Sequence, residues 1–265
     1  MLKTIARASD VLALFSRDVP DWGVREVASR LAIPKSNAHE LLASLAEVGL
    51  LQRTSKSRYR LGWRLLSLTD TLVSGAGFHK MGTVIIQELS DECGASVQLA
   101  AYDGKDAILI GQSRGRGAAR VEFSVGERLP SHSTAAGKLL LASRLVGPVL
   151  PDVVRASMSP FTRMTIESPD RLTAELNAIR VSRMATDTGE TIEGISCIAV
   201  PVREHGGDET VASLSISVPT KRMSSARSHY ARAAFTAARR LSVTLPEKLD
   251  PIDNVAPRCE PMMAS

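Results

Sequence analysis

The sequence predicts a mixed α+β protein with an N-terminal winged helix-turn-helix unit and a C-terminal domain around an antiparallel sheet. Three observations predict this arrangement. Three short helical patterns and a basic hairpin follow one another within residues 1–62. Strand and helix patterns are then mixed, with hairpin turns, from residue 80 onward. The chain has 265 residues, of which 44% are hydrophobic, which is enough for two domains of ordinary size.

Helices are expected over 4–17, 24–31 and 35–48 in the N-terminal unit. Pro34 suits the first position of the third helix, where no backbone N–H is needed, and Gly49 suits the position after its end. The apolar positions at helical spacing, which should face the core, are Ile5, Ala8, Val11, Leu12 and Phe15, then Val24, Val27, Ala28 and Leu31, then Ala38, Leu41, Leu42, Leu45 and Val48. Helix, helix, turn and helix is the order of a helix-turn-helix motif.

Residues 50–62 predict two short strands around a Thr-Ser-Lys-Ser turn, which would form a basic wing. Residues 1–80 carry 12 Lys or Arg and 7 Asp or Glu, whereas residues 81–265 carry 21 of each, so the whole net charge of +5 lies in the first third. Such a surplus alone is compatible with a solvated surface. Its coincidence with the helix-turn-helix pattern favours double-stranded DNA as the partner of this unit, over a helical domain for protein contacts.

The exposed face of the third helix should enter the major groove, where Asn can pair with adenine and Glu can accept from cytosine. Basic side chains of the hairpin should reach phosphates or the minor groove. The candidate DNA-binding residues are Lys35, Ser36, Asn37, His39 and Glu40 on the helix, and Arg53, Lys56, Arg58 and Arg60 on the hairpin.

A linker helix is expected over 63–79, the C-terminal domain over 80–245, and a disordered tail over 246–265, where four prolines occur without periodicity. Within the C-terminal domain we expect helices over 81–92, 133–143, 168–183 and 224–241, and strands over 96–102, 107–113, 121–125, 197–202 and 211–218.

Four features of the C-terminal domain suggest a binding site, and each also has an ordinary explanation. Ser133 or Thr134 can cap a helix whose first turn, Ala135-Ala136-Gly137, leaves backbone N–H groups open to an anion, but helix caps are common. The hydroxyls of Ser213, Ser215 and Ser217 share one face of a strand, which could equally be solvent-facing. Cys197 begins an apolar strand and could be a small buried hydrophobe, and Asp187 lies in a polar turn.

Common enzyme motifs match this sequence poorly. STAAGK resembles the end of a phosphate-binding loop, but His132 and Leu139 stand where the motif requires Gly and Ser or Thr. A nucleophilic triad of Cys197, His132 and Asp187 is conceivable from residue types alone, which leaves an enzyme with a fused DNA-binding domain as the alternative hypothesis.

The histidines and the three cysteines lack metal-binding or disulfide spacing, so we expect no metal and no cofactor. The chain lacks a long apolar run or a signal sequence, so we expect a cytoplasmic protein without a membrane partner.

Several ordered motifs resemble the IclR family of bacterial transcriptional regulators. They are IPKSNAHELLASLAEVGLLQR (33–53), YRLGWRLLSL (59–68), LPSHSTAAGKLLLA (129–142), FTRMTIESPDRLTAELNAIR (161–180), TGETIEGISCIAVPV (188–202) and SLSISVP (213–219). The resemblance covers residues 4 to about 242 and implies a winged helix-turn-helix, a linker helix and a GAF-like domain that binds a small effector. It also implies homodimers or homotetramers on pseudo-palindromic operators.

The resemblance places the family's effector-pocket positions on residues already noted: Ala135, Ala136, Asp187, Cys197, Ser215 and Ser217. The effector is expected to be a small organic acid. Because a carboxylate would meet Asp187 unfavourably, a hydroxylated acid that donates to Asp187 is our hypothesis. The chain departs from the family at Asn37-Ala38-His39-Glu40, where Thr-Val-x-Arg is common, so base preference cannot be transferred.

Overall fold

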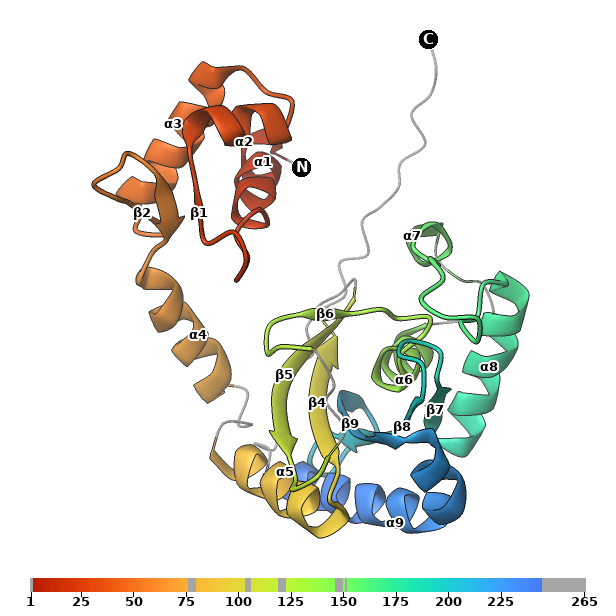
Figure 1. Cartoon of the computed structure of the whole chain (residues 1–265). Helices are drawn as coiled ribbons and strands as arrows, with labels where there is room; N and C mark the ends of the chain where they lie inside the picture. The colour runs from red at the N-terminus through yellow and green to blue at the C-terminus, as the bar shows by residue number, and fades with distance from the viewer. Residues whose placement is uncertain are drawn as a thin grey trace. The chain divides into compact units, whose positions relative to one another are not determined.

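The structure is a computed structural model, which describes residues 2–75, 80–102, 106–118, 123–145, 150 and 152–244. The chain divides into two compact units between Gly75 and Ala76, drawn in Figure 1. The last residues of the expected linker helix, 76–79, and the expected tail, 246–265, lie outside the described residues. Across the described part of the chain, no helix is long and apolar enough to cross a membrane.

The N-terminal unit is a winged helix-turn-helix, as its sequence pattern predicts. Its helices are α1 (Lys3–Leu12), α2 (Val24–Arg30), α3 (Lys35–Glu47) and α4 (Arg64–Gly75), and its strands are β1 (Asp21–Trp22), β2 (Leu51–Arg53) and β3 (Tyr59–Leu61). The strands form an antiparallel sheet in the order β1-β3-β2, so the wing is a three-stranded sheet and not only the predicted hairpin.

Apolar side chains from α1, α2, α3 and the wing share one core. Its fully buried members are Val11, Val27, Ala38, Leu42, Leu45, Leu51 and Tyr59. The predicted stripes were wrong at two ends: Ile5 is 64% exposed near the start of α1, and Val48 is exposed at the end of α3. Gly49 follows with a φ of +80°, which confirms the predicted glycine after the helix.

Gly62 connects the wing to α4 in a space that only glycine fits. A Cβ atom at this position would lie 2.1 Å from the backbone oxygen of Gly49. Helix α4 begins two residues later, and large apolar side chains near it are exposed, among them Trp63 (67%), Leu66 and Leu72 (71%). Their exposure leaves an apolar surface on the described part of the linker helix.

The C-terminal unit is an α+β domain around one curled sheet. Its helices are α5 (Lys80–Cys93), α6 (Ala135–Arg144), α7 (Asp152–Ala156), α8 (Pro169–Ser182) and α9 (Thr220–Thr244). Its strands are β4 (Ser96–Tyr102), β5 (Ala107–Arg114), β6 (Arg128–Leu129), β7 (Ala185–Thr188), β8 (Ile195–Arg203) and β9 (Thr210–Pro219). All neighbouring strands are antiparallel, in the order β6-β5-β4-β9-β8-β7.

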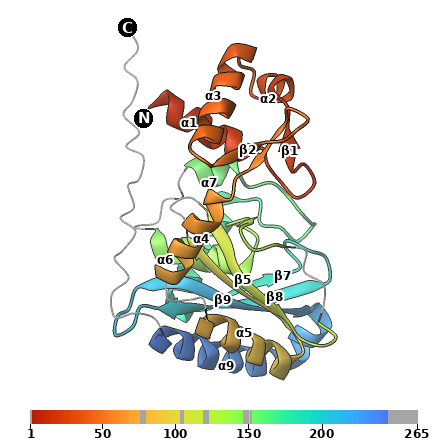
Figure 2. The same cartoon turned by 90° about the vertical axis from the view of Figure 1, so that its left-hand side faces the viewer.

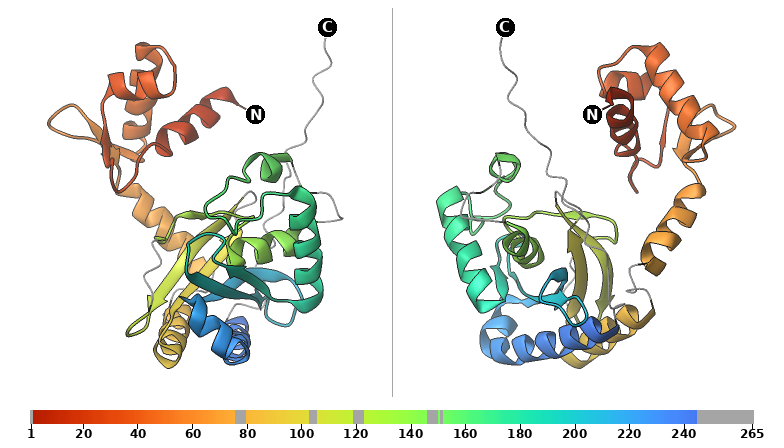
Figure 3. Two further views of the ribbon diagram at one scale, coloured as in Figure 1. Left: turned by 45° about the vertical axis from the view of Figure 1, so that its right-hand side comes forward. Right: turned by 180° about the vertical axis from the view of Figure 1, so that it is seen from behind.

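Helices cover both faces of this sheet. Figure 2 shows α5 and α9 side by side under one face, where they bury the aliphatic side chains of β4, β8 and β9. Helices α6 and α8 lie over the opposite face, and Figure 3 shows α6 above the strands. Because both faces are covered, polar residues of the central strands on the α6 face are enclosed within the domain.

Two predictions for the C-terminal domain need correction. Of the expected strand over 121–125, residues 121–122 lie outside the described residues, and 123–125 form no strand. The short strand β6 follows them and pairs with β5. Asp187 lies in β7, paired with Cys197 of β8, and not in the polar turn that begins after it. The sequence ATDT is too short and too polar to signal a strand by itself.

Candidate functional site

The outward face of α3 carries the residues predicted to read DNA. Lys35, Ser36, His39 and Glu40 are exposed, while Asn37 is half-buried. The Ser36 hydroxyl donates a hydrogen bond to Oδ1 of Asn37 over 3.3 Å. The buried face of α3 packs on α2 and the wing and so fixes the outward face as one rigid surface.

The wing presents exposed basic side chains on both of its main strands and at its tip. Lys56 lies at the tip, in a turn closed by hydrogen bonds from the N–H of Thr54 to the Arg58 oxygen and from Ser57 to the Thr54 oxygen, 2.7 and 3.0 Å long. Arg53 and Arg60 are exposed and make hydrogen bonds of 3.3 Å to Ser57 and Gln52. Within the part of the chain that the structure describes, none of these three cations forms an ion pair, so all three are available to a polyanion.

Arg58 does not share this freedom, because acidic side chains of the same unit hold it. Its guanidinium forms ion pairs with Asp21 and with Glu26, the latter over 2.7 Å, and donates to the Asp21 oxygen over 3.0 Å. These partners raise the pKa of Arg58, and Arg58 in turn lowers the pKa of Glu26. Glu26 also accepts from the N–H of Gly23 at the start of α2. Arg58 therefore joins the β2–β3 hairpin of the wing to β1 and α2.

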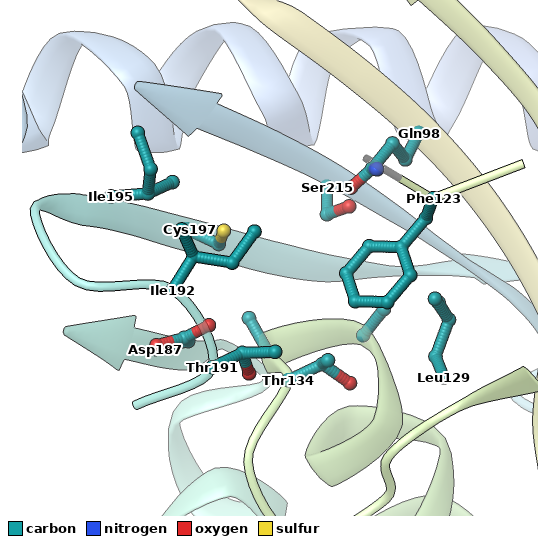
Figure 4. A pocket seen from close by; sticks show the side chains of 12 residues that line it. Gln98, Phe123, Leu129, Thr134, Asp187, Thr191, Ile192, Ile195, Cys197 and Ser215 are labelled. Atoms are coloured by element: carbon teal, nitrogen blue, oxygen red, sulfur yellow. The ribbon is translucent and has the colours of Figure 1, made fainter. Parts of the chain in front are cut away.

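The C-terminal domain holds a small cavity between the sheet and the start of α6 (Figure 4). Five of the six predicted effector residues line it: Ala135, Ala136, Asp187, Cys197 and Ser215. The remaining lining residues are Gln98, Phe123, Leu129, Thr134, Thr191, Ile192 and Ile195. The sixth predicted residue, Ser217, lies beneath the lining.

The N-terminus of α6 supplies the cavity with backbone donors. The hydroxyl of Thr134 caps the helix, accepting from the N–H of Gly137 over 3.0 Å and donating to the Pro130 oxygen over 2.8 Å. The N–H groups of Ala135 and Ala136 belong to the first turn, which has no acceptor inside a helix, so they can hold an anion. A Cβ atom on Gly137 would lie 2.6 Å from the Pro130 oxygen, so glycine keeps this turn tight.

Asp187 faces the same cavity from β7. Its side chain is almost fully buried, and its Oδ1 atom accepts from the N–H of Glu190 over 2.6 Å. Burial raises the pKa of Asp187 to about 6, although the N–H of Glu190 works in the opposite direction. The cavity therefore has an acidic group that ionises near neutral pH opposite a helix N-terminus.

A buried ion pair fixes the turn that follows Asp187. Lys138 of α6 is 0% exposed, and its Nζ atom lies 2.8 Å from both carboxylate oxygens of Glu190 and 3.3 Å from Glu175 of α8. Thr165 adds a 2.6 Å hydrogen bond to the Glu190 backbone oxygen. The ion pair is non-local, since Lys138 and Glu190 are 52 residues apart, and the sequence analysis missed it.

The floor of the cavity is made by side chains of the central strands. The thiol of Cys197 lies 3.0 Å from the Ser217 hydroxyl, which also lies 3.5 Å from Oε1 of Gln98. Ser213, Ser215 and Ser217 are all buried, so the solvent-facing explanation for this stripe was wrong. The alternation of these serines with aliphatic residues correctly predicted that their hydroxyls share one face of the strand. It could not show which part of the domain covers that face.

The geometry gives no support to a Cys197 nucleophile. Burial raises the pKa of its thiol to about 12, far from the range of a reactive thiolate. Nε2 of His132 is 2.9 Å from the Ser159 backbone oxygen, and the pKa of His132 is lowered by burial. Neither group is arranged to activate the other.

The lining residues that the sequence analysis missed are chiefly apolar. Phe123, Leu129, Ile192 and Ile195 form the walls, and nothing in their spacing distinguishes them from ordinary core residues. Gln98 did carry a signal, because it is the one amide in the otherwise apolar strand pattern SVQLAAY. A polar side chain in a strand that is buried on both faces points to a partner within the domain or to a ligand.

Comparisons with known proteins agree across the chain. Residues 71–243 match the model of the bacterial transcriptional regulator IclR C-terminal domain, and residues 4–55 match the IclR helix-turn-helix domain. The HTH-type transcriptional regulator KdgR of Dickeya chrysanthemi is 31% identical over 83% of this chain and 72% of its own length. XynR of Escherichia coli is 29% identical over 85% of this chain and 90% of its own length.

Solved structures show the same fold. The crystal structure of an IclR homolog from Microbacterium hydrocarbonoxydans, complexed with 4-hydroxybenzoate, superposes with a TM-score of 0.73 at 23% identity, covering 91% of this chain and 98% of that one. With a helix-turn-helix unit, a covered curled sheet and both family models matched in order, this chain belongs to the IclR family of bacterial transcriptional regulators.

Proposed function

We propose that the cavity beneath α6 is an effector site and that its ligand is a small organic acid with a second, hydrogen-bond-donating group. One observation carries this proposal: Ala135 and Ala136 in the first turn of α6 and the buried Asp187 line one cavity together with apolar side chains. The helix N-terminus favours a carboxylate. Asp187 accepts a hydrogen bond from a hydroxyl, and the walls accommodate the hydrocarbon part of the ligand.

An aromatic hydroxy acid has the required chemistry. The 4-hydroxybenzoate in the Microbacterium homolog carries a carboxylate and a hydroxyl at opposite ends of a flat apolar ring. Phe123 and Leu129 offer apolar contacts for such a ring in this chain. We therefore take 4-hydroxybenzoate as the first probe.

Calorimetric titration with three probes tests this chemistry. We expect 4-hydroxybenzoate to bind at least tenfold more tightly than benzoate, because benzoate leaves the Asp187 carboxyl without a donor. It should also bind more tightly than 4-hydroxybenzaldehyde, which lacks the anion. Equal affinities for all three probes would refute the assignment of the carboxylate to the N-terminus of α6 and of the hydroxyl to Asp187.

The proposed mechanism couples this cavity to DNA. Effector binding favours one conformation of the C-terminal unit, and that preference changes how α3 and the wing engage an operator. Lys35, Ser36, Asn37, His39 and Glu40 would contact bases, and Arg53, Lys56 and Arg60 would contact phosphates. Operator affinity measured with and without bound 4-hydroxybenzoate tests the coupling, because a ligand that binds without changing this affinity is not an effector.

We further propose that the regulator acts as a homodimer or homotetramer. The exposed apolar side chains at α4, including Trp63, Leu66 and Leu72, suit burial against a second copy. Sedimentation of the chain and of its Leu72→Glu variant tests this surface. A variant that sediments like the unchanged protein would place the subunit contact elsewhere.

A further inference from the structure

The floor of the effector cavity continues across the sheet as a row of polar side chains. Asp187, Cys197, Ser217, Ser96 and Arg114 lie directly opposite one another on β7, β8, β9, β4 and β5. Directly opposed residues of antiparallel strands point to the same face. The row therefore has a carboxyl group at one end and a guanidinium group at the other, both on the face that α6 covers.

A second row reinforces the first. Ser215, Gln98 and Gln112 lie opposite one another on β9, β4 and β5, two residues along each strand from the first row. The amide of Gln98 is buried, and its Nε2 atom has no hydrogen-bond partner among the described residues. A buried amide without a partner is costly, so a ligand atom that accepts from it is expected.

Gln98 lies between two hollows. One is the effector cavity, and the other is lined by Ser96, Gln98, Gln112, Ser113 and Arg114. Figure 4 shows the Gln98 amide beside Ser215 and Phe123, at the end of the cavity away from Asp187. The two hollows therefore share the Gln98 side chain, whose amide N–H groups have no acceptor among the described residues.

The second hollow has the chemistry of an anion subsite. Arg114 is exposed and makes no ion pair within the described part of the chain. A guanidinium binds a carboxylate with two parallel hydrogen bonds, and the amides of Gln98 and Gln112 can add further donors. No acidic side chain lines this hollow in the described residues.

We propose that the effector site includes a second subsite, formed by Gln98, Gln112 and Arg114, which binds an anionic group at the far end of an elongated ligand. The proposal rests on the effector cavity proposed above, because the near end of the same ligand occupies it. Cys197 and Arg114 are three strands apart, which is about 14 Å at ordinary strand spacing. The long, flexible side chain of Arg114 can reach toward the cavity, so a shorter ligand suffices. The ligand class is therefore an elongated diacid.

The test compares dicarboxylates with monocarboxylates of equal length by calorimetry on the full chain. Adipate, suberate and sebacate are each paired with hexanoate, octanoate and decanoate. We expect the diacid to bind at least tenfold more tightly than its monoacid at one or more lengths, because it adds charge-assisted hydrogen bonds at Arg114. Arg114→Ala should reduce this preference to about onefold.

Two further variants complete the design. Arg116→Ala removes a neighbouring exposed arginine that lines neither hollow, and it should keep the full diacid preference. Gln98→Leu keeps the bulk but loses the amide, and it should lower diacid affinity, with the thermal midpoint reporting its folding. A diacid preference that survives Arg114→Ala overturns the subsite. If the monoacids bind but the diacids bind no more tightly, the second subsite is overturned and the acid effector is not. If neither series binds and 4-hydroxybenzoate does not bind either, the acid effector is overturned as well.

Discussion

At the scale of single residues, the basic side chains of the wing have two different roles. Arg58 is held by Asp21 and Glu26, 37 and 32 residues away, so its charge is largely neutralised within the protein. Lys56 at the wing tip is exposed, and no described residue pairs with it. Only a cation without a protein partner gains its full electrostatic energy from a phosphate.

This difference predicts opposite results for two substitutions. Lys56→Ala should weaken DNA binding at all sequences and reduce the slope of log affinity against log salt by about one. Arg58→Ala should leave that slope unchanged and lower the thermal midpoint of the N-terminal unit, because it releases β1 and α2 from the wing. Fluorescence anisotropy at several salt concentrations, with thermal unfolding alongside, measures both. A reduced slope in Arg58→Ala would show that Arg58 contacts a phosphate.

Asp187 predicts a particular pH dependence of stability. Its pKa rises from the ordinary value of about 3.9 to about 6 on folding, so the native state binds more protons than the unfolded state between these values. The free energy of unfolding should therefore fall as pH rises from about 4 to about 6 and level off above. Asp187→Asn cannot ionise and should gain up to about 3 kcal/mol over the unchanged protein between pH 4 and 7.

Urea denaturation at pH 4.5 and pH 7 measures this gain. Asp152→Asn, which replaces an exposed carboxylate at the start of α7, is the matched control and should show no comparable gain. A constant difference between Asp187→Asn and the unchanged protein across this pH range would contradict the raised pKa.

At the scale of elements, the Lys138–Glu190 ion pair joins α6 to the turn between β7 and β8. Helix α6 supplies the N–H groups proposed to bind an anion, and Asp187 lies in β7 directly before the turn, so this ion pair holds the two polar ends of the cavity at a fixed separation. A buried charge that loses its partner is strongly destabilising, whereas removing both charges is much less so.

Substitution of this pair should be strongly non-additive. Lys138→Met should cost about 3–5 kcal/mol, because Glu190 is left buried without its cation. The double variant Lys138→Met with Glu190→Gln should cost less than the two single variants together, by about 0.5–3 kcal/mol. Denaturant unfolding of all four proteins measures the coupling. Lys221→Met, at an exposed lysine of α9, should be neutral, and additive single costs at Lys138 and Glu190 would exclude the coupling.

Features that depend on interactions local in the sequence are predictable from it, whereas features that depend on distant partners are not. Helices α3 and α6 were predicted from local periodicity and caps, as Gly49 and Thr134 illustrate. The partners of Arg58 and Lys138 were not, because they lie far away along the chain and no local pattern encodes them. Ile5 and Val48 fit the apolar periodicity but lie near helix ends, beyond the reach of the core.

At the scale of the whole molecule, the chain consists of two units with separate cores. Among the described residues, the core of the N-terminal unit draws its members from that unit, and the clusters of the C-terminal unit draw theirs from the C-terminal unit. An effector that binds in the C-terminal cavity therefore contributes its binding energy to the stability of that unit.

Calorimetric unfolding should accordingly show two transitions. A ligand at one hundred times its Kd should stabilise the C-terminal transition by about 2.7 kcal/mol and leave the N-terminal one in place. Lys56→Ala, which lies in the other unit, serves as a control that should change neither transition appreciably. A single transition that moves as a whole with ligand would show that the units unfold cooperatively.

The cross-strand rows beneath α6 also bear on the order of folding. Ser217 and Gln98 meet across 119 residues, so the cavity floor can form only after nearly the whole C-terminal unit has been synthesised. Such non-local pairing is slow, whereas the short-range helices of the N-terminal unit form quickly and leave the ribosome first. On each newly synthesised chain, the DNA-binding unit therefore folds before the C-terminal domain that controls it.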